Sequence, residues 1–219
     1  MKFKLKSALI AATLALMTAT VAKADANPAN DSGSFTVRIT PNVDLGVTVD
    51  TTGANWAGAS TNLDVTSDLA TDTLLEAPVK VAMAGNFSNQ ELTLTGVALD
   101  TWVLDTDEID VVDQMRLYGT FGLDPFFAGT PDAVDFTAAD LITTAAKRAG
   151  QPQADEDALT DVNHVYELPG AHAESEEVDH MTVSTTRSLW LRTRTPNTTT
   201  TSGQARFTVI VTAVSGPGL

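Results

Sequence analysis

A period of two in the apolar side chains near the end of the sequence constrains the fold more than any other feature. Within residues 204–214, Phe207, Val209, Val211 and Ala213 share one face of an extended chain, and two threonines lie on the other. This period of two is typical of a strand with one buried face. Further strands are expected at about 43–50, 76–84, 90–98, 100–104, 114–122, 162–168 and 180–195.

Turn-forming residues separate these segments and indicate a fold made of short strands. Pro41-Asn42, Gly85-Asn86 and Pro196-Asn197 are dipeptides of this kind. Nine or ten short strands at fairly regular spacing predict an all-β, mainly antiparallel fold, either a two-layer β-sandwich or a jelly roll. Residues 34–219 are expected to form it as a single domain.

One short helix is predicted within residues 137–149. Thr137 is a suitable N-cap, with Asp140 three residues later. Lys147 would lie in the last turn, where a positive charge is favourable, and Gly150 stands where a glycine often ends a helix. The pattern therefore indicates a single helical element beside the strands.

The first 24 residues have the three parts of a secretory signal. Three lysines precede an apolar run from Ala8 to about Met17, and Ala22 and Ala24 provide the small residues that signal peptidase reads. This run is too short to span a hydrocarbon core of roughly 30 Å. We therefore expect cleavage after Ala24, and a mature chain that is secreted to the cell surface, the extracellular space or the periplasm without inserting into a membrane.

Charge and cysteine content exclude several classes of function. The signal holds four of the 13 basic residues and none of the 28 acidic ones, so the formal net charge of the mature chain is −19. So acidic a chain is unsuited to nucleic acid, whose phosphates are bound by Lys and Arg. The sequence has no cysteine, which excludes disulfides and zinc–thiolate sites. Stability must come from an ordinary apolar core.

A flexible arm, residues 25–33, precedes the first candidate strand. In that strand Phe35, Val37 and Ile39 form an apolar face. An arm that leads directly into such a strand can lend the strand to the open sheet edge of a neighbouring molecule. The alternative is that the strand pairs within its own domain, beside residues 204–214.

The densest acidic cluster is a candidate calcium site, because calcium takes six to eight oxygen ligands. The spacing begins like an EF-hand loop but lacks the glycine that the turn requires, so a solvated charge run is the alternative. The cluster consists of Asp105, Asp107, Glu108, Asp110 and Asp113. A second cluster without a better pattern consists of Asp155, Glu156, Asp157 and Asp161.

Residues 189–194 offer a candidate binding face. Trp190 alternates with Arg192 and Arg194 on one side of a predicted strand, opposite Leu189 and Leu191. An aromatic ring beside two cations would suit a carbohydrate ligand if this side were exposed. The alternative is that Trp190 covers the edge of the core and that the arginines pair with nearby acids.

No arrangement of residues indicates catalysis. The three histidines, His164, His172 and His180, have neither the spacing of a metal pair on a strand nor that on a helix. The sequence contains no Gly-x-Ser-x-Gly motif and no glycine-rich phosphate loop. We therefore expect that the protein is not an enzyme.

Two functions are compatible with these features. The first is an exported structural or interaction protein, a subunit of an extracellular filament, sheath or surface layer that assembles with copies of itself by β-strand contacts. The second is a monomeric extracellular β-sandwich module that binds carbohydrate or calcium. Export and the absence of a catalytic pattern favour the first.

Overall fold

The computed structural model describes residues 44–57, 63, 67–124, 130–150, 165–168, 181–203 and 205–216. The chain divides into two units, Met1–Pro41 and Asn42–Leu219, and every described residue belongs to the second. The predicted signal peptide, the predicted arm, and the predicted strand with Phe35, Val37 and Ile39 lie outside the described residues.

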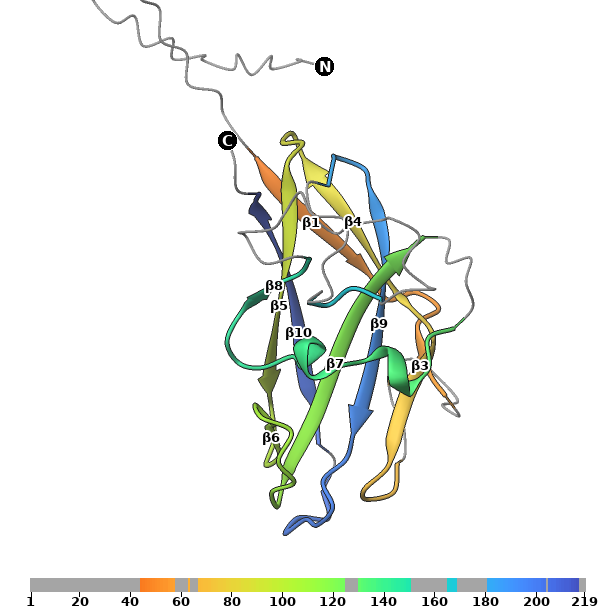
Figure 1. Cartoon of the computed structure of the whole chain (residues 1–219), viewed down its shortest axis with the longest axis vertical. Helices are drawn as coiled ribbons and strands as arrows, with labels where there is room; N and C mark the ends of the chain where they lie inside the picture. The colour runs from red at the N-terminus through yellow and green to blue at the C-terminus, as the bar shows by residue number, and fades with distance from the viewer. Residues whose placement is uncertain are drawn as a thin grey trace, which may run out of the picture. The chain divides into compact units, whose positions relative to one another are not determined.

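Two β-sheets form the domain, so the prediction of an all-β, sandwich-like fold is confirmed (Figure 1). The first sheet contains β1 (Leu45–Asp50), β2 (Asn55–Trp56), β3 (Asp72–Ala77), β4 (Val79–Gly85), β6 (Val103–Leu104), β7 (Gln114–Leu123) and β9 (Thr186–Arg194). The second contains β5 (Gln90–Ala98), β8 (Lys147–Arg148) and β10 (Phe207–Ser215). The ladders between these strands are antiparallel, apart from the short parallel pair of β6 and β7.

Strand β9 lies at the centre of the first sheet. β7 pairs along one of its edges, β3 and β4 share the other, and β1 continues the sheet beyond β4. In the second sheet β10 and β8 flank β5. One apolar core joins the sheets, to which β9 contributes Leu189 and Leu191, β7 contributes Leu117, and β5 contributes Leu92 and Leu94.

The predicted helix at 137–149 is wrong. Only two short 3₁₀ turns form nearby, η1 (Ala133–Asp135) and η2 (Ala138–Asp140). The capping box is real, because the Asp140 carboxylate accepts from both the backbone N–H and the hydroxyl of Thr137 at 2.8 Å. The chain then extends, and Ile142 N donates to Leu117 O of β7 at 2.7 Å. Hydrogen bonds to neighbouring strands thus replace those that would continue a helix.

Several strand boundaries also differ from the predicted ones. Pro78, which has no N–H to donate, separates β3 from β4 where one strand was expected. The segment expected at 100–104 contributes only the two residues of β6, and the segment expected from 180 begins as β9 at Thr186. Of residues 162–168, the described part makes isolated bridges, which join Val165 to Gly150 and Glu167 to Phe121.

Residues 141–149 connect the two sheets along one side of the sandwich. Ile142 N bonds to β7, and the next residue's carbonyl, Thr143 O, accepts from Gly96 N of β5 at 2.8 Å. Ala149 N donates to Leu92 O, also at 2.8 Å. A Cβ at Gly96 would overlap the side chain of Leu104, which shows that the two sheets approach closely here. The outer edges of β7 and β5 are therefore both covered on this side.

Candidate functional site

The opposite side of the sandwich is bordered by β1 and β10, and we call it the open side. Figure 1 shows these two strands at the borders of their sheets, and among the described residues neither pairs with a further strand. The open side is defined by Leu45, Val47 and Val49 of β1, and by Phe207, Val209, Val211 and Ala213 of β10.

The register of β10 determines which of its backbone groups face the open side. Leu99 N donates to Arg206 O at 2.9 Å, and Gly216 N donates to Asn89 O at 2.8 Å. Hydrogen-bonded and non-bonded pairs alternate along an antiparallel ladder. Even-numbered residues of β10 thus direct their backbone groups to β5. The odd-numbered residues, from Phe207 onward, direct theirs to the open side.

Strand β1 has the same arrangement. Asn86 N donates to Asp44 O at 2.9 Å, so even-numbered residues of β1 face β4. Leu45, Val47 and Val49 therefore direct their N–H and C=O groups to the open side. Among the described parts of the chain, no residue takes up these groups.

The residues whose backbone faces the open side also carry its apolar side chains. Phe207, Val209, Val211 and Ala213 are half-buried and pack against the core from β10, as Val47 does from β1. Alternation along each strand explains the coincidence, because side chains of one parity point to one face of the sheet. An added strand would meet apolar side chains and free backbone groups at the same positions.

A cavity of about 770 Å³ lies between the sheets at the open side. The indole N–H groups of its two tryptophans are satisfied, since Trp56 Nε1 donates to Leu63 O at 2.9 Å and Trp102 Nε1 donates to Thr199 Oγ1 at 3.0 Å. The rings thus add apolar surface without an unpaired donor. The lining of the cavity includes Val49, Trp56, Trp102, Leu189, Val209 and Val211.

Gln90 joins β1, β4 and β10 at one end of these strands. Its side chain is fully buried, accepts from Gly46 N of β1 at 3.1 Å, and donates to Ala84 O and Phe87 O at 2.8 Å each. In the ladder between β5 and β10, Gln90 stands opposite Ser215, the last residue of β10. The two border strands thus come together at Gln90, whereas the cavity lies toward the end of β1 and the start of β10.

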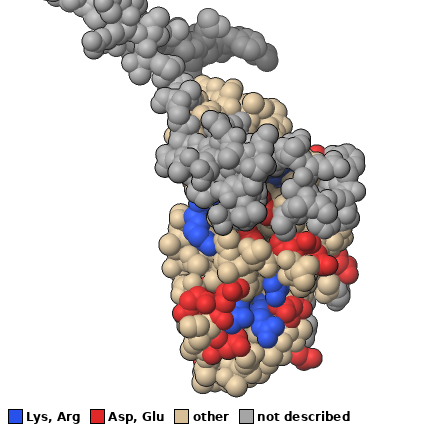
Figure 2. Space-filling model, in the orientation of Figure 1, with Lys and Arg blue, Asp and Glu red and all other residues tan. Residues whose placement is uncertain are grey.

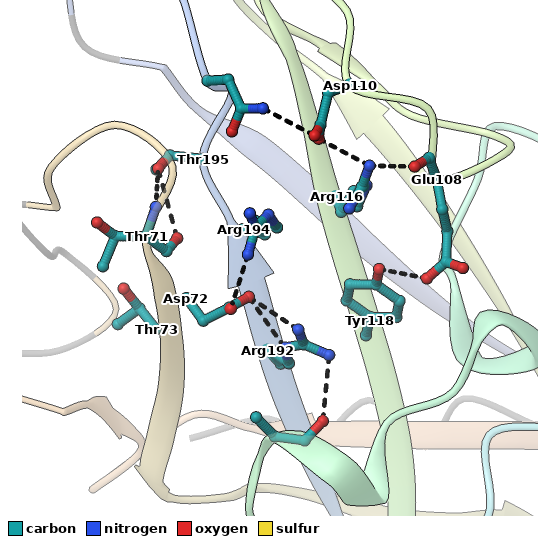
Figure 3. A network of polar contacts seen from close by, with 12 residues as sticks. Thr71, Asp72, Thr73, Glu108, Asp110, Arg116, Tyr118, Arg192, Arg194 and Thr195 are labelled. Atoms are coloured by element: carbon teal, nitrogen blue, oxygen red, sulfur yellow. Dashed lines mark hydrogen bonds and ion pairs between the residues drawn. The ribbon is translucent and has the colours of Figure 1, made fainter.

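The acidic loop after β6 is organised around an arginine. Arg116 Nε donates to Asp105 Oδ2 at 3.0 Å. Figure 3 shows another nitrogen of the same guanidinium bonded to Asp110, at 2.8 Å, and to the carbonyl of Glu108. Burial raises the pKa of Asp105, but the N–H of Asp107 and the guanidinium outweigh it and hold this pKa below its ordinary value.

The remaining carboxylates of the loop face different partners. Tyr118 donates its hydroxyl to Glu108 at 2.6 Å, and burial together with this bond raises the pKa of Tyr118. Asp113 accepts from the hydroxyls of Thr199 and Thr200, which lower its pKa. Asp107 Oδ1 accepts from the backbone N–H of Ile109 in its own loop. Within the described ranges no three His, Asp or Glu residues are arranged to hold a metal ion.

Residues 189–194 present no exposed aromatic platform. Trp190 is only 4% exposed. Asp72 of β3 accepts from Arg192 at 2.9 Å and from Arg194 at 3.1 Å, and Arg192 also lies 4.8 Å from the centre of the Tyr118 ring (Figure 3). The strand has the predicted alternation, but its second face is covered and its two cations are paired with an acid.

The acidic surface is not uniform on the side that carries β7. Figure 2 shows acidic and basic side chains next to one another there. The ion pairs of Arg116 with Asp110 and of Arg192 with Asp72 account for part of this arrangement. No helix in the described part of the chain is long and apolar enough to cross a membrane.

Some predicted site residues lie outside the described residues. These are the three histidines and the second acidic cluster, along with the apolar face of the predicted assembly strand. Sequence reasoning missed the cavity, because its walls come from six strands and the loops between them. It also missed Arg116, although a basic residue that follows an acidic run in the sequence was a signal that could have been used.

Comparison with known proteins assigns the chain to no family. No protein-family model matches the chain, and no curated protein is similar to it in sequence.

Proposed function

We propose that this protein is an exported structural subunit that assembles with copies of itself by β-strand addition at the open side. The observation that carries the proposal is the pair of unpaired strand edges, on β1 and β10, that border one apolar cavity. Strand addition supplies main-chain hydrogen bonds from the edge and specificity from the side-chain pockets beside it.

The composition of β10 supports this proposal. Natural sheets protect their edges with charged residues, proline or bulges, because an exposed edge recruits other strands. Strand β10 contains no charged residue and no proline, and its ladder with β5 runs without interruption from Phe207 to Ser215. Its outer face also exposes Ile210, at 42%. Such an edge is suited to a partner strand.

The geometry of strand addition favours an extended assembly. A contact that joins a donor strand to a different surface on the next copy is heterologous, and such contacts form open filaments unless their rotation closes a ring. This is the arrangement expected of a filament, sheath or surface-layer subunit.

Sedimentation velocity and negative-stain microscopy of the purified exported protein test the proposal. Wild type is expected to form polymers. Val211→Pro is expected to form far fewer, because proline removes a backbone N–H that faces the open side while leaving the β5 ladder intact. Val211→Ala keeps that N–H and is the matched control. A wild-type protein that stays monomeric at all concentrations contradicts the proposal.

A further inference from the structure

We infer that the open side of one molecule accepts residues 34–40 of a second copy, with Phe35, Val37 and Ile39 in the cavity. This inference rests on the proposed function and names the segment and partner involved. Residues 34–40 directly precede the described domain, which begins at Asp44.

The pattern of this segment fits the open side. A strand between β1 and β10 would have one face toward the apolar cavity and the other toward solvent, so its residues must alternate. In residues 34–40 the apolar Phe35, Val37 and Ile39 alternate with Ser, Thr and Arg. In the sequence outside the described ranges and after the predicted signal, no other segment has three large apolar residues at this spacing.

The backbone of both borders suits an inserted strand. The odd-numbered residues of β1 and of β10 direct their N–H and C=O groups to the space between the two strands. In a ladder the backbone groups of successive residues alternate between the two neighbours. Because β1 and β10 already lie close together near Gln90, an inserted strand would enter at the cavity end, where it can take up backbone groups from both edges.

The residues between 34–40 and β1 disfavour a tight hairpin that would place residues 34–40 beside β1 of the same molecule. Asp44 already bonds to Asn86 through both its N–H and its C=O, which leaves only residues 41–43 for the turn. Two-residue hairpin turns require positive φ at the first central residue, which Pro41 cannot adopt. A three-residue turn closed by Val43 would place Pro41 at the second central position of a type I turn, which proline disfavours because it forces the preceding residue out of the helical region.

The linker is long enough for a neighbouring molecule. The five residues from Ile39 to Asp44 span at most about 17 Å when extended. The donor segment can therefore enter the open side of a copy that lies against the start of β1. Each copy would then donate one segment and accept another.

Disulfide crosslinking between two single-cysteine variants tests the inference, because the wild-type chain has no cysteine to interfere. Val37→Cys in one molecule and Val209→Cys in a size-tagged second molecule are mixed and oxidised. We expect a covalent heterodimer. Ile210→Cys, whose side chain is on the other face of β10, is the matched control and is expected to give at most a few per cent as much heterodimer.

A second pair of variants measures assembly. Val37→Asp is expected to lower the amount of polymer at least tenfold and to leave the thermal midpoint unchanged, whereas Thr36→Asp, on the solvent face, is expected to assemble as wild type does. A fall in the midpoint of monomeric Val37→Asp would place the segment in its own domain and overturn the inference.

The outcomes separate the inference from the proposed function. Polymers that form without the Val37–Val209 crosslink overturn the inference and leave the proposed function standing. An intramolecular disulfide in the double variant, with no heterodimer in the mixture, also overturns it. Absence of both polymer and heterodimer overturns the inference and the proposed function together.

Discussion

Arg116 neutralises a carboxylate that is almost removed from solvent: its Nε lies 3.0 Å from Oδ2 of Asp105, whose side chain is 2% exposed. The guanidinium also reaches Asp110. A positive side chain on β7 thus holds the acidic loop that precedes it.

Loss of this guanidinium is expected to destabilise the domain. Arg116→Ala should lower the free energy of unfolding by about 1–3 kcal/mol, because Asp105 keeps its two backbone donors but loses its charged partner. Arg206→Ala is the control, since its pair with Asp100 is exposed and screened by solvent, so its loss is expected to change stability little. Urea denaturation measures both, and equal losses would show that burial of Asp105 is unimportant.

Acid is expected to weaken the domain through Asp105. Its folded pKa is lowered, so its contribution to stability is complete above the unfolded value near 3.9 and is lost as the pH falls through the folded value. Urea unfolding from pH 6 to pH 2.5 should show this decline in wild type. Asp105→Asn has no carboxyl to protonate there, so its curve should be flatter, and parallel curves would contradict the assignment.

Calcium is expected to leave stability unchanged. Arg116 lies among the carboxylates after β6, and Asp113 is directed instead to Thr199 and Thr200. A ligand that binds only the folded state raises the unfolding midpoint. Thermal unfolding in chelator and in millimolar calcium should therefore give the same midpoint, and a rise of several degrees would restore the calcium site predicted from the sequence.

The close approach of the sheets is expected to make Gly96 intolerant of substitution. Gly96→Ala would place a methyl group against the buried Leu104 and Ile142, and overpacking of this kind costs about 1–3 kcal/mol. Gly203→Ala meets nothing nearer than Thr201 Oγ1 at 3.5 Å and serves as the control. Chemical denaturation should separate the two variants clearly.

The mature chain is expected to begin at Asp25. The lysines, the apolar run and Ala22-Lys23-Ala24 agree on this boundary. The intact mass of the exported protein measures it directly. A mass that includes residues 1–24 would contradict both the predicted export and the mature net charge.

Local patterns in the sequence predicted where the strands lie better than which segments they pair with. Residues 90–98 and 114–122 were predicted almost at the bounds of β5 and β7, because alternation and flanking turns are local signals. The helix at 137–149 failed although its cap was correct. Hydrogen bonds from Ile142 and to Thr143 join strands distant in sequence, which no local signal reveals.

The candidate sites show the same limit. The alternation of Trp190 with Arg192 was correct, but a period of two cannot show which face another segment covers. The acidic run was visible, whereas its partner Arg116 comes from the following strand. The cavity depends on the distance between two sheets, which is a property of the packed fold.

The pairing of β5 with β10 has a consequence for when the protein can fold. The long ladder of β5 is made with β10, a strand more than 100 residues later in the sequence. Contacts between segments so distant in sequence form slowly and late. The border at β10 therefore cannot form until residues 207–215 are available to β5, and a chain that lacks them has no edge at β10.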